Sequence, residues 1–310
     1  MDKKILVAVD ASVYSSNTLH YIERLFKDVR DVHFHLLSAI TCSSLQSGQE
    51  WFDDLELLSK LSPEARKRYA ASKKYMNESI DRLDRHGISK DQVTTEIKLS
   101  RTNVASDILD VARKGLYDAV VIGRRGVSKL EELIMGSVSS TVFEKCHDIP
   151  IWIVDGQVDS RKFLVPVDGS EFCLKAVDHL AFILKDNPYA EITLFHSAAM
   201  FAQKQSLTKK ECAHYLTDEF CQIHADDEKM HFHAPEQILR ENGFPAERIH
   251  RLLTRKGMYP SRQIVRQALI DDFGTIVMGR RGIAMKKGVF GSVTEKVVAM
   301  SVNTALWILG

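Results

Sequence analysis

Apolar residues along the chain fall into short continuous runs that alternate with stretches of helical periodicity. The first run, Ile5–Val9, and a later one, Phe163–Val167, lack the apolar–polar alternation of a half-exposed strand. Runs of this kind predict strands that are buried on both faces, as in a parallel sheet. Each run ends at an aspartate, Asp10 or Asp168, and is followed by apolar residues at helical spacing.

The second half of the chain repeats the order of elements in the first half. Asp10 and Asp168 are 158 positions apart, which is about half of the 310 residues. A repeat of this size indicates a tandem duplication. We therefore expect two domains, residues 1–155 and 161–310, with residues 156–160 as the linker.

Five strands are expected in each half. They cover residues 5–9, 32–40, 93–99, 119–122 and 151–154, and then 163–167, 191–198, 248–253, 275–278 and 305–309. A helix over residues 104–114, with Asn103 as N-cap and Gly115 just past its end, precedes the fourth strand, and residues 261–271 are its counterpart. This alternation predicts an α/β fold with two tandem doubly wound domains, each with a five-stranded parallel sheet.

Each half also carries an extra helical segment between its second and third strands. The two segments cover about residues 49–86 and 207–242, which is long for one helix, so two helices are expected in each. Ser62-Pro63-Glu64 predicts a helix start. Pro235 is expected to break the second segment.

Charge and composition exclude several classes of protein. With 42 basic and 41 acidic residues the net charge is +1, which gives no support for a nucleic-acid partner or a membrane surface. No apolar run is long enough to span a membrane, and the N-terminal run is too short for a signal peptide. Five cysteines without a C-x-x-C pair predict a reduced, cytoplasmic chain.

Glycines follow the fourth strand of each half. Residues 123–139 read GRRGVSKLEELIMGSVS, with Gly123, Gly126 and Gly136 ahead of a helix that begins at Val138. A strand that ends in glycines and leads to a helix N-terminus can hold an anion, because backbone N–H groups reach the ligand and the helix end is partly positive. The pattern returns at Gly279, Gly282 and Gly291.

The expected topology places this loop beside an acidic residue. In an open α/β sheet, ligands bind beyond the carboxyl ends of the strands, where the strand order reverses. If the first and fourth strands are neighbours, Asp10 faces the Gly123 loop across one crevice. This arrangement predicts a nucleotide pocket, with the carboxylate near a base or ribose and the glycine loop near the phosphates.

These residues resemble the ATP-binding members of the universal stress protein family. The family pattern is G-x2-G-x9-G-[ST] after the fourth strand, with an Asp after the first, and the first half matches it in full: Asp10, Gly123, Gly126, Gly136 and Ser137. The resemblance covers nearly the whole chain apart from the helical expansions. It implies two domains with the Rossmann-like, adenine nucleotide alpha hydrolase-like fold.

The resemblance also implies roles for individual residues. Asp10 and the backbone near Ala39 would contact the adenine end, and Ile122 and Gly123 would pass close to the ribose. The phosphates would be surrounded by Arg125, Gly126, Gly136, Ser137, Val138 and Ser139. The counterparts in the second half are Asp168, Ser197, Met278, Gly279, Arg281, Gly282, Gly291, Ser292, Val293 and Thr294.

The expected cofactor is ATP or AMP, with Mg²⁺ accompanying a triphosphate but no dedicated protein cage for the ion. Gly282 and Gly291 are separated by eight residues where the pattern has nine, so the second site is expected to be the weaker one. The arginine pairs Arg124-Arg125 and Arg280-Arg281 are candidates for phosphate contacts, with solvated loop charges as the alternative.

Catalysis has little support in the sequence. No positioned general base is evident, and the loop lacks the Lys-Ser/Thr ending of a Walker A motif, so no catalytic residue is assigned. We expect a nucleotide-responsive stress or regulatory protein; a scaffold with vestigial pockets and a slow ATPase are the alternatives. Family members pair through their last strands, which implies a homodimer or a pseudo-dimer within one chain.

Two pairs of alternating histidines, His33 with His35 and His231 with His233, are candidate metal ligands. On a strand, such a pair would share one face. No cysteine or acidic partner is spaced to complete a metal site, so a structural role is expected.

Overall fold

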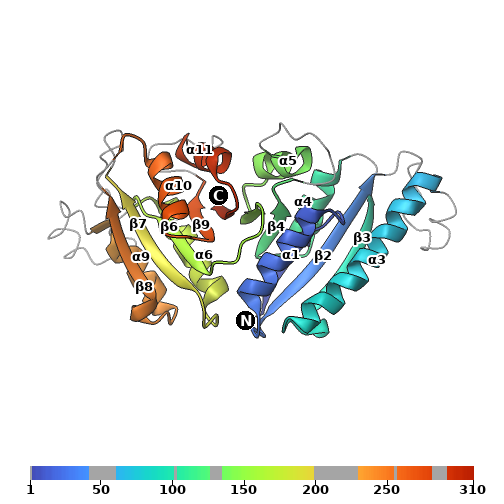
Figure 1. Cartoon of the computed structure of the whole chain (residues 1–310), viewed down its shortest axis with the longest axis horizontal. Coiled ribbons are helices and arrows are strands. Elements are labelled where there is room, and N and C mark those ends of the chain that lie inside the picture. The colour runs from blue at the N-terminus through green and yellow to red at the C-terminus, as the bar shows by residue number, and fades with distance from the viewer. Residues whose placement is uncertain are drawn as a thin grey trace. The chain divides into compact units, whose positions relative to one another are not determined.

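The computed structural model describes residues 2–41, 61–100, 103–125, 135–198, 230–254, 257–280 and 292–310. The chain divides into two compact units, residues 1–157 (unit 1) and 158–310 (unit 2). Both units have the expected α/β architecture, in which helices pack against a parallel sheet (Figure 1).

Five parallel strands form the sheet of each unit. In unit 1 these are β1 (Lys3–Ala8), β2 (Val32–Thr41), β3 (Val93–Ser100), β4 (Ala119–Gly123) and β5 (Ile151–Val154). In unit 2 they are β6 (Lys162–Pro166), β7 (Glu191–Ser197), β8 (Ile249–Thr254), β9 (Thr275–Gly279) and β10 (Ala305–Leu309). The strand orders are β3-β2-β1-β4-β5 and β8-β7-β6-β9-β10, which confirms the doubly wound prediction.

Helices connect the strands and pack in pairs. Unit 1 contains α1 (Val13–Phe26), α3 (Pro63–Arg85), α4 (Val104–Lys114) and α5 (Ser137–Lys145), and unit 2 contains α6 (Glu171–Leu184), α9 (Met230–Glu241), α10 (Pro260–Ile270) and α11 (Ser292–Met300). Short 3₁₀ turns, η1 (Lys90–Gln92) and η2 (Ala246–Arg248), precede β3 and β8. Helix α1 packs with α3 and α4 with α5, as expected when right-handed crossovers run in opposite directions from β1 and β4.

Local sequence explains where several helices begin. The hydroxyl of Ser62 accepts a hydrogen bond from the Ala65 amide at 3.2 Å, so α3 starts where the Ser-Pro-Glu signal predicted. Asn103 caps α4 in the same way, through the amides of Ala105 and Ser106. Helix α5 begins at Ser137, one residue before the predicted start.

The prediction that Pro235 breaks a helix was wrong. Helix α9 runs through this residue. Proline removes one backbone donor from the helix, but this loss does not end α9. The rest of the expansions, residues 49–60 and 207–229, lies outside the described residues.

The core of each unit centres on a tryptophan in its last strand. Trp152 lies opposite Val121 in β4, and Trp307 lies opposite Val277 in β9. Both side chains are fully buried. Phe26 stacks on Trp152 with ring centroids 6.1 Å apart, and Phe163 meets Trp307 edge-on at 5.4 Å. The buried tryptophan is therefore shared by the two units, whereas its aromatic partner comes from α1 in unit 1 and from β6 in unit 2.

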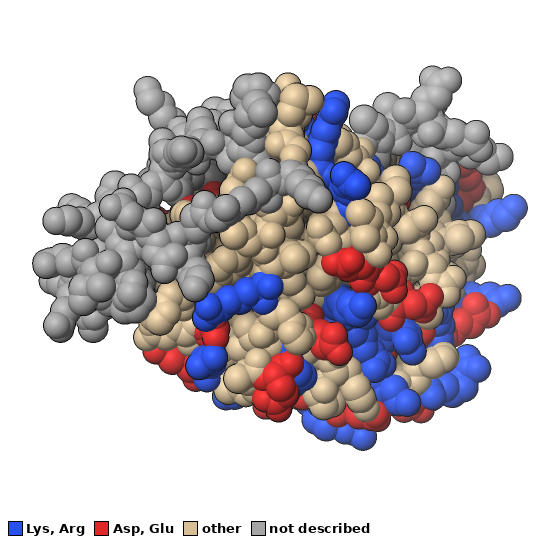
Figure 2. Space-filling model, turned by 60° about the vertical axis from the view of Figure 1, so that its left-hand side comes forward, with Lys and Arg blue, Asp and Glu red and all other residues tan. Residues whose placement is uncertain are grey.

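Surface charge is mixed on the face that Figure 2 presents, where basic and acidic side chains alternate over short distances. This agrees with the net charge of +1. Among the described residues, no helix combines the length and the hydropathy that a bilayer crossing requires.

Candidate functional site

The strand order of unit 1 reverses between β1 and β4, which are hydrogen-bonded neighbours. The register pairs Ala8 with Leu37 and Val7 with Val121. Continued by two residues, this register brings Asp10 level with Ala39 and Val9 level with Gly123. The predicted adenine-end and ribose residues therefore meet at the carboxyl edge of three adjacent strands, where open α/β sheets bind ligands.

Asp10 organises the turn between β1 and α1. Its Oδ1 accepts hydrogen bonds from the hydroxyl of Ser15 at 2.7 Å and from the amide of Ser12 at 3.1 Å. The N-cap of α1 is Ser12, whose hydroxyl accepts from the Ser15 amide. Between them, Ala11 has a positive φ of 59°. The carboxylate of Asp10 is thus held at the strand edge by two donors.

The N-terminus of α5 is fastened directly to the end of β4. The hydroxyl of Ser139 donates to the carbonyl of Gly123 at 2.7 Å, and the amide of Gly136 donates to the carbonyl of Arg124 at 2.9 Å. Gly136 is the N-cap and offers no side-chain acceptor, while Ser137 and Val138 in the first turn are exposed. This helix end therefore presents backbone donors and a partial positive charge. Gly126 lies outside the described residues.

Gly123 lies against the first turns of α1. A Cβ added there would be 3.1 Å from the carbonyl oxygen of Arg125 and 3.5 Å from Thr18 Oγ1 and from Tyr14 Cβ. Ile122, the preceding residue, is buried. The absence of a side chain at Gly123 thus keeps the edge between β4 and α1 open.

The first arginine after each of β4 and β9 is buried rather than solvated. Arg124 is only 3% exposed and pairs with Asp155 across 3.4 Å, and Arg280 is 1% exposed. Burial lowers the pKa of the Arg124 guanidinium, and the charge of Asp155 opposes that change. Both arginines point into the protein, so neither is a solvated loop charge. Arg125 is half-buried.

Unit 2 reproduces two of these arrangements. The hydroxyl of Thr294 donates to the carbonyl of Gly279 at 3.0 Å, as Ser139 does to Gly123. Asp168 Oδ1 accepts from the amide of Ser170 at 3.0 Å and from its hydroxyl at 2.6 Å. The residue after Asp168 is Gly169, with φ of 77°, at the position of Ala11. The strand-edge turn is therefore shared by the two units.

Unit 2 also differs from unit 1 at this edge. A Cβ at Gly279 would lie 2.6–2.8 Å from the backbone and Cβ of Phe172, so the start of α6 presses on the end of β9. The hydroxyl of Ser197, at the position of Ala39, donates to Gln263 Oε1. Met278 and Thr294 are buried, and Val293 is half-buried. Arg281, Gly282, Gly291 and the Ser292 side chain lie outside the described residues.

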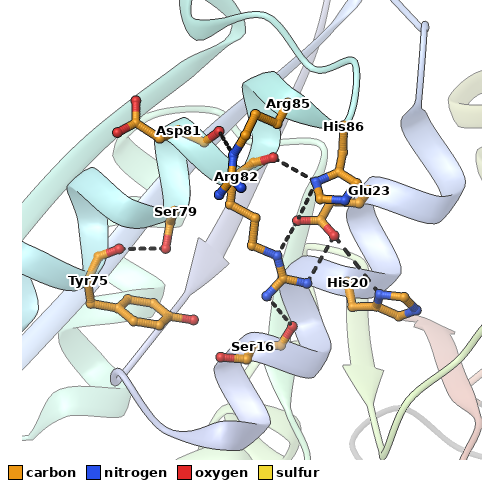
Figure 3. A network of polar contacts seen from close by, with 9 residues as sticks. All are labelled: Ser16, His20, Glu23, Tyr75, Ser79, Asp81, Arg82, Arg85 and His86. Carbon is orange, nitrogen blue, oxygen red and sulfur yellow. Dashed lines mark hydrogen bonds and ion pairs between the residues drawn. The ribbon is translucent and has the colours of Figure 1, made fainter.

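A partly buried ion pair ties helix α3 to α1 (Figure 3). Glu23 of α1 is 4% exposed, and its Oε1 lies 2.5 Å from Nε of Arg82 on α3. Arg82 Nη2 donates to the other carboxylate oxygen at 2.9 Å, and Nη1 donates to the carbonyl of Ser16 at 3.4 Å. This ion pair fixes the position of α3 relative to the Asp10 turn.

Sequence reasoning missed Tyr75, which α3 brings toward Asp10. Removal from water raises the pKa of the Tyr75 phenol, and the negative charge of Asp10 adds to the rise. The phenol is therefore within electrostatic reach of that carboxylate. Figure 3 shows the ring directed toward Ser16 on α1. The only sequence signal was a tyrosine on the same helical face as Ser72 and Ser79, which does not specify what the face packs against.

Metal chemistry has no support in the described residues, where no cluster of three or more His, Cys, Asp or Glu side chains could hold an ion. His35 instead lies 2.8 Å from Thr94 Oγ1 and 3.3 Å from Glu96 Oε2. His231 belongs to helix α9 rather than to a strand, and its ring stacks on that of His196 at 4.1 Å.

The cysteines of the described residues are core side chains. Cys146 and Cys173 are buried and free of disulfides. Burial, reinforced by the charge of Asp168, raises the pKa of the Cys173 thiol, so it stays protonated and unreactive.

Comparison with known proteins agrees with this architecture. The model of the universal stress protein family matches residues 1–155 and 160–302. A universal stress protein from Archaeoglobus fulgidus DSM 4304 is 18% identical and has a TM-score of 0.65, and the match covers 99% of this chain and 97% of that one. A functionally unknown protein from Pseudomonas aeruginosa PAO1 is 14% identical with a TM-score of 0.53, covering 99% and 92% of the two chains.

A universal stress protein in complex with cAMP matches at 20% identity and a TM-score of 0.34, covering 48% of this chain and 96% of that one. No curated protein sequence matches the chain. The family model spans nearly the whole sequence, once in each half, and the structures of similar length share the fold. The chain therefore belongs to the universal stress protein family.

Proposed function

We propose that unit 1 binds an adenine nucleotide, ATP or AMP, at the carboxyl edge of β1 and β4, and that occupancy regulates the protein. One observation carries the proposal: the uncapped N-terminus of α5 is fastened to the end of β4 at the point where the strand order reverses. Helix N-termini at such points bind phosphate through backbone donors. Gly126 and Arg125 complete the proposed phosphate site.

The adenine end of the proposed ligand lies toward Asp10 and Ala39. The Asp10 carboxylate is held in place by Ser12 and Ser15, so it can accept a hydrogen bond from a base or ribose without first being ordered. We add Tyr75 to the proposed lining of this end, because α3 directs its ring toward Ser16, the residue after the Ser15 that holds Asp10. With ATP, Mg²⁺ would be held mainly by the phosphates.

We propose that the counterpart site in unit 2 is weaker, and that its domain serves mainly as a structural partner. The contact between Gly279 and Phe172 leaves less room than the contacts around Gly123, and Ser197 is engaged with Gln263. The proposed role is binding rather than hydrolysis, with no catalytic residue assigned. A cytoplasmic location and a homodimer paired through the last strands complete the proposal, and light scattering measures the assembly.

A substitution at Ser137 tests the proposal. Gly136 has φ of −64° and ψ of 154°, which is the conformation that a following proline requires, and proline is favoured at the first helical position. Ser137→Pro therefore removes one first-turn N–H and leaves α5 intact, while Ser137→Ala removes only the hydroxyl. We expect calorimetry to show ATP binding that weakens about tenfold in Ser137→Pro relative to Ser137→Ala, since hydrogen bonds to charged groups contribute about 1.5–3 kcal/mol.

The matched control is Ser292→Pro, at the start of α11 in unit 2, which should leave the tighter ATP affinity unchanged. Adenosine, which lacks phosphate, should bind Ser137→Pro and Ser137→Ala equally. The proposal is refuted if millimolar ATP gives no heat with the wild-type protein. Equal ATP affinities of Ser137→Pro and Ser137→Ala would show that this helix end does not hold the phosphates.

A further inference from the structure

A shallow apolar groove of about 440 Å³ lies between α10 and α11 in unit 2. Its lining consists of Arg262, Val265, Arg266, Leu269, Ile270 and Met300. Leu269 and Ile270 are 58% and 61% exposed, which is unusual for two adjacent aliphatic side chains on one helix. The groove belongs to neither proposed nucleotide site, because it lies on helices away from the Asp168 edge.

The duplication supplies an internal comparison for this groove. Leu116 and Asp272 are the positive-φ residues that follow α4 and α10, with φ of 51° and 56°, so the two helices align with an offset of 156 residues (272 minus 116). In unit 1 the positions of Leu269, Ile270 and Arg266 are occupied by Arg113, Lys114 and Asp110, and the position of Met300 by Lys145. At each of these four positions, the charge of the side chain differs between unit 1 and unit 2.

In unit 1 an ion pair occupies the region that corresponds to this groove. Arg113 Nε and Nη2 donate to the two oxygens of Asp148 at 2.8 and 3.1 Å, which ties the end of α4 to the segment that follows α5. In unit 2 the position of Asp148 is Asn303, when α5 and α11 are aligned on Ser139 and Thr294. The fold therefore does not require an apolar surface here, because unit 1 folds with a charged one.

Positive charge gathers at one end of the groove. Arg262 and Lys296 both lie over the ring of Tyr259, at 5.5 and 5.7 Å from its centroid, and Arg266 is one helical turn beyond Arg262. All three cationic side chains are exposed. The opposite end has the carboxylates Asp271 and Asp272 beyond Ile270, with Asp271 accepting a hydrogen bond from Gln267 at 2.5 Å. Glu295 is the acidic neighbour of Lys296.

We infer that this groove docks an amphipathic helix of a partner protein, with apolar side chains against Leu269, Ile270 and Met300 and carboxylates facing Arg262, Arg266 and Lys296. Helices that dock in grooves use apolar anchors at i, i+3, i+4 and i+7, and complementary charge selects the partner. A second copy of the chain is the alternative occupant, and the sedimentation experiment below distinguishes it from a partner helix.

The test uses two fluorescein-labelled synthetic helices with leucine at i, i+3, i+4 and i+7, one with glutamate and one with lysine at the other positions. Fluorescence anisotropy with the full chain should show micromolar binding of the glutamate peptide and at least about tenfold weaker binding of the lysine peptide, a difference of about 1.4 kcal/mol. Equal affinities of the two peptides, or no binding of the glutamate peptide at 1 mM protein, overturn the inference.

The variants follow from the duplication. The double variant Leu269→Arg with Asn303→Asp introduces the ion pair of unit 1 into unit 2. It should lower the affinity for the glutamate peptide at least about tenfold. Arg266→Asp, the residue type of unit 1, should weaken it by reversing one charge. The control is Leu116→Arg in unit 1, which changes another exposed leucine. This variant should bind the glutamate peptide with the affinity of the wild type.

Circular dichroism melting shows whether each variant folds. Wild-type affinity in both groove variants would overturn the inference. Sedimentation of the wild-type chain that reveals self-association, abolished by Leu269→Arg with Asn303→Asp, would assign the groove to a second copy and would also overturn it.

Discussion

The hydroxyl of Ser139 and the carbonyl of Gly123 are joined by a hydrogen bond of 2.7 Å, and Thr294 and Gly279 form the same bond in unit 2 at 3.0 Å. Both hydroxyl residues are buried. The bond holds the helix after the glycine loop against the end of the preceding strand. The proposed phosphate site of unit 1 depends on this attachment, because the strand end and the helix end must stay together to share one ligand.

We predict that Ser139→Ala lowers the free energy of unfolding of unit 1 by about 1 kcal/mol, which is typical of one intramolecular hydrogen bond. Ser139→Thr should cost less, because unit 2 uses threonine at this position. Urea unfolding followed by tryptophan fluorescence measures both. If Ser139→Thr destabilised the protein as much as Ser139→Ala, the hydroxyl would not be the stabilising group.

The turn after the first strand of each unit requires a positive φ, which Ala11 and Gly169 adopt at 59° and 77°. An L-residue in this region is strained by about 1–2 kcal/mol, whereas glycine is not. We predict that Gly169→Ala lowers the stability of unit 2 by about 1 kcal/mol. Ala11→Gly should change the stability of unit 1 by less, because relief of strain is offset by the greater freedom of glycine in the unfolded chain.

Urea unfolding of these two variants provides the measurement, and Gly243→Ala gives a comparison at an exposed turn with φ of 88° and open space around the new Cβ. A stabilising effect of Gly169→Ala would contradict the assigned backbone conformation.

Much of this fold follows from the sequence, because its strands are continuous apolar runs between clear helix signals. Helix α4 begins and ends at the predicted residues, Val104 and Lys114, where Asn103 supplies the cap. Asp10 was expected to face the glycine loop if the first and fourth strands are neighbours, and the register shows that β1 and β4 are. The roles of the individual site residues remain predictions.

Other features depend on contacts between distant segments and have no local signal. Arg124 turns inward because Asp155, 31 positions later, is placed beside it by β5. The approach of Tyr75 to Asp10 depends on the packing of α3 against α1. The tight contact of Gly279 with Phe172 and the groove between α10 and α11 likewise arise from packing between elements, which periodicity and caps do not specify.

The interaction between Glu23 and Arg82 should contribute strongly to the free energy of unfolding, because Glu23 is only 4% exposed. We predict that Arg82→Met lowers the free energy of unfolding by about 3 kcal/mol, since it leaves a buried carboxylate without its main partner. Glu23→Leu combined with Arg82→Met should cost less than Arg82→Met alone.

The exposed pair of Arg68 with Glu64 is the control for charge removal from α3, and Arg68→Met should cost less than about 1 kcal/mol. Thermal and urea unfolding measure all three variants. A cost for Arg82→Met as small as that for Arg68→Met would show that the pair does not hold α3 against α1.

His179 should make unit 2 sensitive to acid. The half-buried side chain lies edge-on against Trp307, with ring centroids 6.0 Å apart, and removal of the imidazole from water lowers its pKa from 6.5 to about 3. The unfolded chain therefore takes up the proton first, so stability is full above pH 6.5 and falls as the pH drops from 6.5 toward 3. The loss from this residue should reach about 2 kcal/mol at pH 5, at about 1.4 kcal/mol per pH unit.

His179→Phe keeps an aromatic ring against Trp307 and should reduce the loss of stability between pH 7.5 and pH 5 by that amount. Urea unfolding at the two pH values provides the measurement, and His250→Asn, at an exposed histidine, should leave the wild-type pH dependence unchanged. An unaltered pH dependence in His179→Phe would mean that His179 does not titrate as described.

The central claim is that the first-turn amides of α5 hold the phosphates of an adenine nucleotide. Nitrogen–proton correlation spectra of the full chain test it most directly, with ATP and adenosine added separately at millimolar concentration. We predict that ATP shifts the amide resonances of Ser137, Val138 and Ser139 and that adenosine leaves them in place. Unchanged resonances at saturating ATP, or equal shifts with adenosine, would contradict the claim.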